Sequence, residues 1–370
     1  MQPFALEKWF GKYEFVVETD IGSSCIRPFG LAEFLRETGT EIPDDISLGY
    51  RDSKGSLSLR KTIAARYDGA GEDNILITIG ASEANYLALR VLVELVSSAV
   101  VQFPAYQQLY EVLINGGVRV DRWQMHVEDG YRPKPAEAGA MLGQGAVLVI
   151  TNPHNPTGAL LEAAELDQLH DAVETKGGWL YSDEVYSGLA LAGQPRPVTA
   201  WRANGRTICI GSMSKSYGLA GSRIGWLVAP PDLIQRCWSL RDYVSICPPA
   251  FSEWLAETAL RRGDAVEARN RSIIDANLAT VNAMLPLLGP KFEFVPPRAG
   301  VLAFPRINST ETMWELCTRL AEEDSVLLVP GEVFERPGHV RLGLGGDPAA
   351  LKRGLSALAK RLAKSPARIS

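Results

Sequence analysis

Residues 207–229 read TICIGSMSKSYGLAGSRIGWLVA, and no other stretch says as much about the chain. Two continuous apolar runs flank a loop of small residues that carries Lys215 and, eight positions later, Arg223. Runs of this kind are typical of parallel strands buried on both faces of a sheet, because half-exposed antiparallel strands alternate. A lysine directly after such a strand is in an unusual place for a solvated charge.

The loop between the two runs predicts a nucleophilic amine held in a pocket. Lys215 could form a Schiff base with a carbonyl, helped by a pKa that we expect burial or cationic neighbours to lower. Ser212, Ser214 and Arg223 suit a nearby phosphate, because hydroxyls and a guanidinium donate several hydrogen bonds to its oxygens. The alternative is a surface lysine in a glycine- and serine-rich loop.

Outward from this loop, short apolar runs alternate with helical stretches from about Asn74 to Val228. The alternation predicts an α/β domain with a mostly parallel sheet flanked by helices. Beyond Pro248 long helical patterns and short strand candidates indicate a smaller α+β domain. We expect a large domain over residues 45–250 and a small discontinuous domain built from 1–44 and 251–370.

Composition excludes several classes of protein. The chain has 370 residues, 46% hydrophobic and 22% charged, with a formal net charge of −5, which argues against disorder and against recruitment of nucleic acid. Its five cysteines show no metal-type spacing, so we expect reduced thiols and no bound metal. No signal peptide or membrane-length apolar run is visible, which favours a cytoplasmic protein without membrane contact.

Three further segments place polar groups after apolar runs, where ligands bind in open α/β sheets. NPHNPTG, residues 152–158, is a dense turn that makes Asn155 available to a site. Asp183 ends the run WLYSD and could cap a helix or pair with a protonated ring nitrogen. Gly80, Ala81 and Ser82 open a long helix, and small residues there offer free N–H groups to an anion.

Together these segments resemble the class I/II aminotransferase family, the fold type I enzymes that use pyridoxal 5'-phosphate (PLP). The S-x-S-K-x-x-x-L-x-G-x-R-x-G run at 212–225 is the most specific part of a resemblance that spans about 49–341. It implies that Lys215 holds PLP as an internal aldimine and then moves the proton from the substrate Cα. It also implies that Asp183 pairs with the pyridinium nitrogen, and that Tyr186 and Asn155 hydrogen-bond the phenolic oxygen.

The same resemblance assigns further contacts. Tyr106 matches the aromatic residue that stacks on the cofactor ring, and Arg341 matches the arginine that grips the substrate α-carboxylate. Tyr50 resembles the tyrosine that reaches the phosphate of the neighbouring subunit, which implies a homodimer with shared active sites. The residues expected to hold the phosphate are Ala81, Ser82, Ser212 and Arg223.

The family signature implies an external aldimine and Cα deprotonation but leaves the next step open. Reprotonation of the cofactor gives transamination, whereas loss of a side-chain leaving group gives elimination, replacement or cyclisation. Residues 18–27, with Ser23 and Ser24 set against the substrate, are similar to capreomycidine synthase-like cyclases, which dehydrate a hydroxylated arginine and close its guanidine onto the chain. The similarity favours a lyase or cyclase of antibiotic biosynthesis, with an ordinary aminotransferase as the alternative.

Two other points stay open at the level of sequence. Glu18 or Asp20 could meet a substrate guanidinium, although a surface role fits them equally well. Aminotransferase-like domains also serve as non-catalytic, PLP-responsive regulators with an N-terminal DNA-binding domain, for which we see no room before Tyr50. The intact set of Lys215, Asp183 and Arg341 favours an enzyme acting on an amino acid.

Overall fold

Alternate side chains of the central strands enter two separate hydrophobic clusters, one on each face of a sheet. In β5 (Val147–Thr151), Val147 and Val149 join one cluster while Leu148 and Ile150 join the other. This double burial explains the continuous apolar runs of the sequence, because neither face of these strands meets water. The computed structural model describes residues 1–203 and 205–364.

The sheet has seven strands in the order β2-β8-β7-β6-β5-β3-β4. Its strands besides β5 are β2 (Ile75–Ile79), β3 (Ser98–Phe103), β4 (Arg119–Gln124), β6 (Trp179–Asp183), β7 (Thr207–Ser212) and β8 (Ile224–Val228). The pairs β7–β6, β6–β5, β5–β3 and β3–β4 are parallel, whereas β8 runs antiparallel to both β2 and β7. The mostly parallel sheet expected from the sequence is therefore confirmed, with one reversed strand.

Two features of the sheet differ from the sequence interpretation. The run RIGWLVA was read as parallel, but β8 is reversed, and a run buried on both faces looks the same in either direction. β4 was missed altogether, because this edge strand, RVDRWQ, has mostly exposed or half-exposed side chains and lacks an apolar run. Polar residues suit an edge, where they discourage pairing with another chain.

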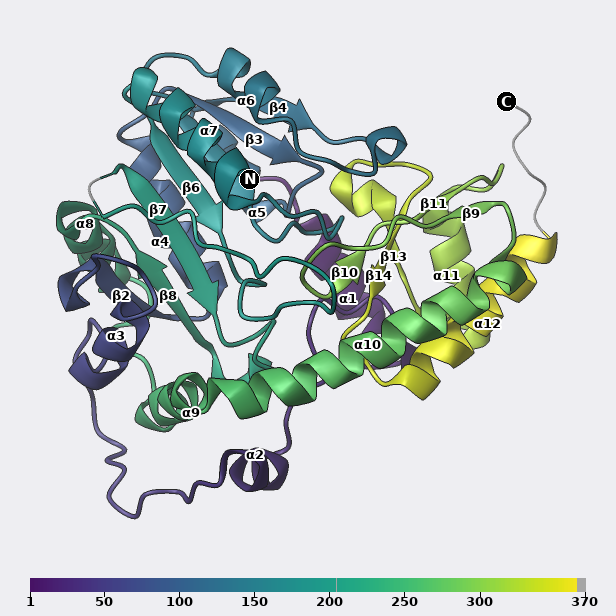
Figure 1. The fold of residues 1–370 in the computed structure, drawn as a ribbon, viewed down its shortest axis with the longest axis horizontal. Helices are drawn as coiled ribbons and strands as arrows, with labels where there is room; N and C mark the ends of the chain where they lie inside the picture. Colours follow the sequence, from purple (N-terminus) through teal and green to yellow (C-terminus); the bar gives the residue numbers. More distant parts are fainter. Residues whose placement is uncertain (204, 365–370) are drawn as a thin grey trace.

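Helices flank the sheet as the alternating pattern predicted, and Figure 1 shows them around it. They are α3 (Leu57–Ala64), α4 (Ala81–Val93), α5 (Gln108–Asn115), α6 (Pro135–Met141), α7 (Ala163–Thr175), α8 (Pro231–Arg241) and α9 (Ala250–Arg261), with 3₁₀ turns η1 (Glu72–Asn74), η2 (Val127–Asp129) and η3 (Ala220–Ser222). Among the described residues, none of the helices combines the length and the apolar character needed to cross a bilayer.

The remaining elements come from both ends of the chain. They are α1 (Ala5–Tyr13), β1 (Thr19–Asp20), α2 (Leu31–Thr38), α10 (Gly263–Leu288), β9 (Phe292–Glu293), β10 (Leu302–Ala303), β11 (Arg306–Ile307), α11 (Met313–Asp324), β12 (Val326–Leu327), β13 (Val329–Pro330), η4 (Gly331–Phe334), β14 (Val340–Gly343) and α12 (Pro348–Lys364). Parallel pairing of β1 with β12 joins the two ends, and α10 extends from beside α9 to α12 (Figure 1). The two-domain division itself stays a prediction.

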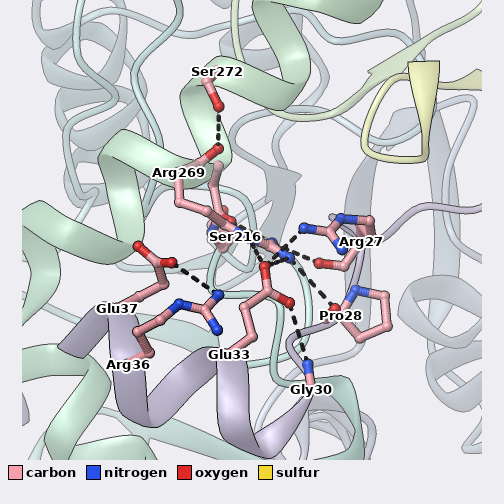
Figure 2. Close-up of polar contacts among 10 residues, drawn as sticks. Arg27, Pro28, Gly30, Glu33, Arg36, Glu37, Ser216, Arg269 and Ser272 are labelled. Atoms are coloured by element: carbon pink, nitrogen blue, oxygen red, sulfur yellow. Dashed lines mark hydrogen bonds and ion pairs between the residues drawn. The ribbon is translucent and has the colours of Figure 1, made fainter. Parts of the chain in front are cut away.

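A polar network fastens the N-terminal segment to α10 close to the lysine loop (Figure 2). Arg269 of α10 donates from Nη2 to Glu33 Oε1 of α2 at 3.1 Å and from Nη1 to the carbonyl of Arg27 at 2.7 Å. Its neighbour Asn270 donates to the carbonyl of Ser216 at 2.7 Å. The segment after β1 and the residue that follows Lys215 are therefore held by the same turn of α10.

Candidate active site

The carboxyl ends of the parallel strands surround a pocket of about 230 Å³, which we call the strand-end pocket. Because β8 is reversed, it begins at the edge where the other strands end, and this places Arg223 at the pocket too. Of the predicted site residues, the pocket is lined by Ser23, Ser24, Ala81, Ser82, Tyr106, Asn155, Asp183, Tyr186, Ser212, Lys215, Arg223 and Arg341.

Lys215 lies in this pocket between the end of β7 and the N-terminal segment. Its Nζ donates to Ser24 Oγ at 2.8 Å and lies 3.4 Å from Cys25 Sγ. Burial acts to lower the pKa of Lys215, but interactions with the Cys25 thiol and the Tyr186 phenol outweigh burial, so the pKa is raised. The lowered pKa expected from the sequence is therefore wrong for the free amine, because Cys25 carried no sequence signal that marked it as a neighbour.

Asp183, at the end of β6, is a buried carboxylate held by defined donors. Asn85 Nδ2 donates to Asp183 Oδ2 at 3.1 Å, and the backbone N–H of Val185 donates to Oδ1 at 3.3 Å. Tyr181 in turn fixes Asn85 with a 2.5 Å hydrogen bond to its Oδ1. Burial raises the pKa of Asp183 to about 6, against the lowering effect of Asn85. Asn85 was missed from the sequence, although it lies one helical turn after Ala81 on α4.

An anion cradle forms where α4 begins, from Ala81, Ser82, Ser212 and Arg223. Gly80 precedes the helix with a φ of +76°, and a Cβ on it would lie 2.4 Å from Arg223 Nη2. The guanidinium therefore lies against bare glycine backbone, beside the first N–H groups of the helix. A helix N-terminus and an arginine together favour a phosphate or another small anion.

Three predicted ring contacts also face the strand-end pocket. Tyr186 is buried, and the amide oxygen of Asn155 is buried without a partner among the residues that the structure covers. Tyr106 donates its hydroxyl to Glu7 Oε1 of α1 at 3.1 Å and packs against Phe4, with ring centroids 4.9 Å apart. A buried amide oxygen without a hydrogen-bond partner is costly. Asn155 therefore indicates that a polar group of a ligand lies beside it when the site is occupied.

Arg341, in β14, is fully buried with part of its donor set unused. Its Nε and Nη2 donate to the carbonyl of Gly22 at 3.2 and 3.0 Å, while Nη1 has no partner within the described chain. Phe10 and Phe334 lie 5.5 and 5.4 Å from its Cζ and shield the cation from water. A buried guanidinium with a free donor facing a pocket is a strong attractor for a carboxylate.

Tyr50, Glu18 and Asp20 do not line the strand-end pocket of their own chain. Tyr50 is 88% exposed and does not line the strand-end pocket of its own chain. Glu18 is exposed outside the pocket, and Asp20 instead accepts the backbone N–H groups of Gly22 and Ser23 at 2.7 and 2.9 Å. The carboxylates that do line the pocket besides Asp183 are Glu7 and Glu14, which carried no motif.

Comparison with known proteins defines the class. Residues 44–358 match the family described as aminotransferase class I and II, and the chain belongs to that family. A capreomycidine synthase from Streptomyces vinaceus is 32% identical over 96% of this chain and 93% of its own length. An arginine–pyruvate transaminase from Pseudomonas aeruginosa is 28% identical over 81% of this chain and 79% of its own length.

Solved structures agree with the fold. A PLP-dependent aminotransferase from Streptococcus suis superposes with a TM-score of 0.91 at 31% identity, covering 100% of this chain and 99% of that one. A PLP-dependent cyclase named OrfR superposes with a TM-score of 0.90 at 28% identity, covering 98% of both chains. The fold type I architecture and the PLP-dependent class expected from the sequence are confirmed.

The chemistry of the strand-end pocket fits PLP. The cradle at α4 suits the phosphate, Lys215 supplies a primary amine for the aldehyde, and Asp183 supplies a carboxylate for the ring nitrogen. The buried amide oxygen of Asn155, which has no partner among the described residues, can accept a hydrogen bond from a ligand. These groups come from separate strand ends, which the fold brings together at one edge of the sheet.

Proposed function

We propose that this protein is a PLP-dependent lyase or cyclase that acts on an arginine-like amino acid carrying a side-chain hydroxyl. The observation that carries the proposal is the presence of Lys215 and the free Nη1 of Arg341 in one pocket. An α-amino acid needs a carbonyl partner for its amine and a cation for its carboxylate. The two relatives named for capreomycidine and arginine support the choice of side chain.

Each residue has a role that its surroundings favour. Bound PLP supplies an electron sink for the electron pair left on Cα when its proton departs. Arg341 holds the substrate carboxylate and so fixes which bond at Cα faces Lys215. Lys215, hydrogen-bonded to Ser24, takes the Cα proton, and Asp183 keeps a positive ring nitrogen opposite its carboxylate. Tyr106 covers one ring face, and the anion cradle holds the phosphate.

The step after proton removal decides the reaction class. In the favoured branch the substrate loses its Cα proton and its side-chain hydroxyl as one water, and a guanidine nitrogen then closes a ring onto the chain. This reaction needs no external oxidant and no amino acceptor, because its net change is the loss of one water molecule. Ser23 and Ser24 are the pocket's hydroxyls on the N-terminal segment, and they are suited to hydrogen-bonding a polar side chain.

An ordinary aminotransferase is the second candidate. The arginine–pyruvate transaminase and the Streptococcus suis aminotransferase carry names of that class, and transamination uses the same lysine and carboxylate anchor. In this branch Lys215 would return the proton that it takes from Cα, PLP would supply the acceptor for the amino group, and the substrate would leave as a 2-oxo acid whose oxygen comes from water. The homodimer and a cytoplasmic location also remain part of the proposal.

The first prediction concerns Lys215 itself. Purified protein should bind PLP with the yellow colour of a protonated Schiff base, and borohydride should fix the cofactor covalently to it. In Lys215→Ala the covalent adduct should be lost, because no other amine takes the aldehyde. Intact-mass spectrometry gives the readout, and equal labelling of wild type and variant would falsify the assignment of Lys215.

The same preparation separates the two reactions. Incubation with a side-chain-hydroxylated arginine, without any 2-oxo acid, should consume substrate through loss of water while the cofactor stays in its aldehyde form. Stoichiometric pyridoxamine phosphate and a 2-oxo acid would instead establish the aminotransferase. Mass spectrometry of the product and absorbance of the cofactor distinguish these outcomes directly.

A further inference from the structure

One face of α1 lines the strand-end pocket and carries two carboxylates. Glu7, Phe10 and Glu14 are spaced by three and four residues, so they lie on the same side of the helix and its C-cap, and all three line the pocket. Phe10 is also the residue whose ring lies 5.5 Å from Arg341 Cζ. This face of α1 therefore places Phe10 against Arg341, the residue expected to hold the substrate carboxylate. It also places a glutamate on each side of Phe10.

Both carboxylates are exposed to solvent. Glu7 and Glu14 form no ion pair with any residue in the described parts of the chain. Glu7 accepts a hydrogen bond from Tyr106, the residue proposed to cover the cofactor ring. Burial chiefly raises the pKa of Glu14, the charges of Asp20 and Glu7 add to this, and Lys215 opposes it. Although Lys215 and Arg341 line the same pocket, the side formed by α1 carries two exposed carboxylates, which favour a cation there.

A second observation points to a ligand in this space. Arg341 is fully buried, and its Nη1 faces the strand-end pocket without a partner among the residues described. That buried donor needs an anion, whereas the carboxylates of α1 are exposed to solvent and favour a cation. The charges therefore suit a zwitterionic molecule with a carboxylate at one end and a positive group at the other.

We propose that Glu7 and Glu14 form a subsite for the cationic side chain of the substrate, a guanidinium, while Arg341 holds its α-carboxylate. This inference rests on the proposed function of the strand-end pocket and specifies its selectivity. A guanidinium presents five donors in a planar fork, so it can reach both carboxylates and stack its plane near the ring of Phe10. A neutral side chain of the same shape would leave both carboxylates unpaired.

Contacts with other segments hold the helix that carries the subsite. Trp9 anchors the opposite face of α1 through a 3.1 Å hydrogen bond from Nε1 to the carbonyl of Leu328. Gln107 accepts from the backbone N–H of Ala5 at 2.9 Å and donates to the carbonyl of Pro3 at 3.0 Å. A helix held at its start and along its buried face limits the ordering cost to the side chains of Glu7 and Glu14.

The test compares L-arginine with L-citrulline, its neutral isostere, on the holoenzyme. Stopped-flow absorbance of the cofactor gives the Kd of each amino acid from the initial spectral change. Wild type should bind L-arginine roughly tenfold more tightly, the scale of a charge-assisted hydrogen bond at a partly exposed site. In the Glu7→Gln/Glu14→Gln double variant the preference should fall to about twofold or less, with the Kd of L-citrulline unchanged.

Glu18→Gln is the matched control, because Glu18 is an exposed acid of the same segment outside the pocket, and it should keep the wild-type preference. An undiminished preference for L-arginine in the double variant, with both amino acids still changing the spectrum, would overturn the subsite alone. If no amino acid changed the spectrum of wild-type holoenzyme, the proposed function would fall and the subsite with it.

Discussion

At the scale of single residues, burial changes the pKa values of two neighbouring carboxyl groups at the end of β6. Burial raises the pKa of Asp183 to about 6 and that of Glu184 to about 7. Asp183 faces the strand-end pocket, where a positive ring nitrogen would restore its charge. Glu184 does not line the pocket and accepts the backbone N–H of Ala200 at 2.7 Å, so its protonation bears on stability rather than on the cofactor.

Glu184 gives a pH-dependent prediction for the protein without cofactor. Its pKa is higher in the folded state than the ordinary 4.5, so the folded state binds the proton more tightly. The resulting stabilisation is complete below about pH 4.5 and is lost as the pH rises through about 7. Urea unfolding of wild type should therefore show a fall of about 3 kcal/mol across this window from Glu184, beside a smaller contribution from Asp183.

Glu184→Gln should remove that part of the fall, because a neutral amide keeps the contact with Ala200 and has no proton to lose. Glu174→Gln, at an exposed position of α7, should retain the wild-type pH dependence. Equal slopes in wild type and Glu184→Gln would show that Glu184 is not the titrating group.

At the scale of elements, strand ends were predictable and neighbours from distant segments were not. VLVIT identified β5 because both its faces are buried, and the polar residues after such runs identified Asp183 and Lys215. The direction of β8 could not be read, because double burial gives the same pattern either way. Glu7 and Cys25 reach the pocket through packing of the N-terminal segment against the end of the chain, and that packing leaves no local pattern.

The start of α4 lies against Arg223, which precedes the reversed strand β8, so a substitution at Gly80 should disturb the anion cradle. In Gly80→Ala the new Cβ would meet Arg223 Nη2 at 2.4 Å, at a φ of +76° that disfavours any side chain. The arginine must swing out of the anion cradle, so the Kd of the apoprotein for PLP should rise about tenfold or more, the scale of one lost charge-assisted contact. Absorbance titration with PLP measures the change.

Gly263→Ala is the control for that substitution, because nothing lies within 4 Å of a Cβ at this first residue of α10. Its affinity for PLP should match wild type. Thermal melting of both variants separates local loss of the cradle from general destabilisation. If Gly80→Ala bound PLP as tightly as wild type, Arg223 would not be a phosphate ligand.

At the scale of the whole molecule, several large apolar and aromatic side chains are exposed, among them Tyr50, which is predicted to contact the neighbouring subunit. Leu48 and Tyr50 are 95% and 88% exposed, and Tyr243, which follows α8, is 91% exposed. Soluble chains seldom leave such side chains bare without covering them. Residues 44–56 carry neither helix nor strand, so a partner surface is the natural support for Tyr50. In the predicted homodimer, the neighbouring subunit would cover these exposed side chains.

Complementation between two inactive subunits tests the shared site. Tyr50→Ala and Lys215→Ala should each be impaired as pure dimers, Lys215→Ala completely. If Tyr50 serves the neighbour's pocket, a heterodimer unites the intact Lys215 of one subunit with the intact Tyr50 of the other. After denaturation and joint refolding at equal amounts, random pairing through a two-fold interface restores about a quarter of the native sites. Activity should rise toward that level on mixing.

The mixed preparation also distinguishes a shared site from simple dimerisation. If Tyr50 acted within its own chain, every site in the mixture would lack either Tyr50 or Lys215, because a heterodimer would pair two defective pockets. Mixing would then add nothing to the average activity of the two pure variants, even though sedimentation showed dimers. A gain in activity therefore requires both the dimer and a tyrosine that crosses it, and a monomeric wild type would exclude both.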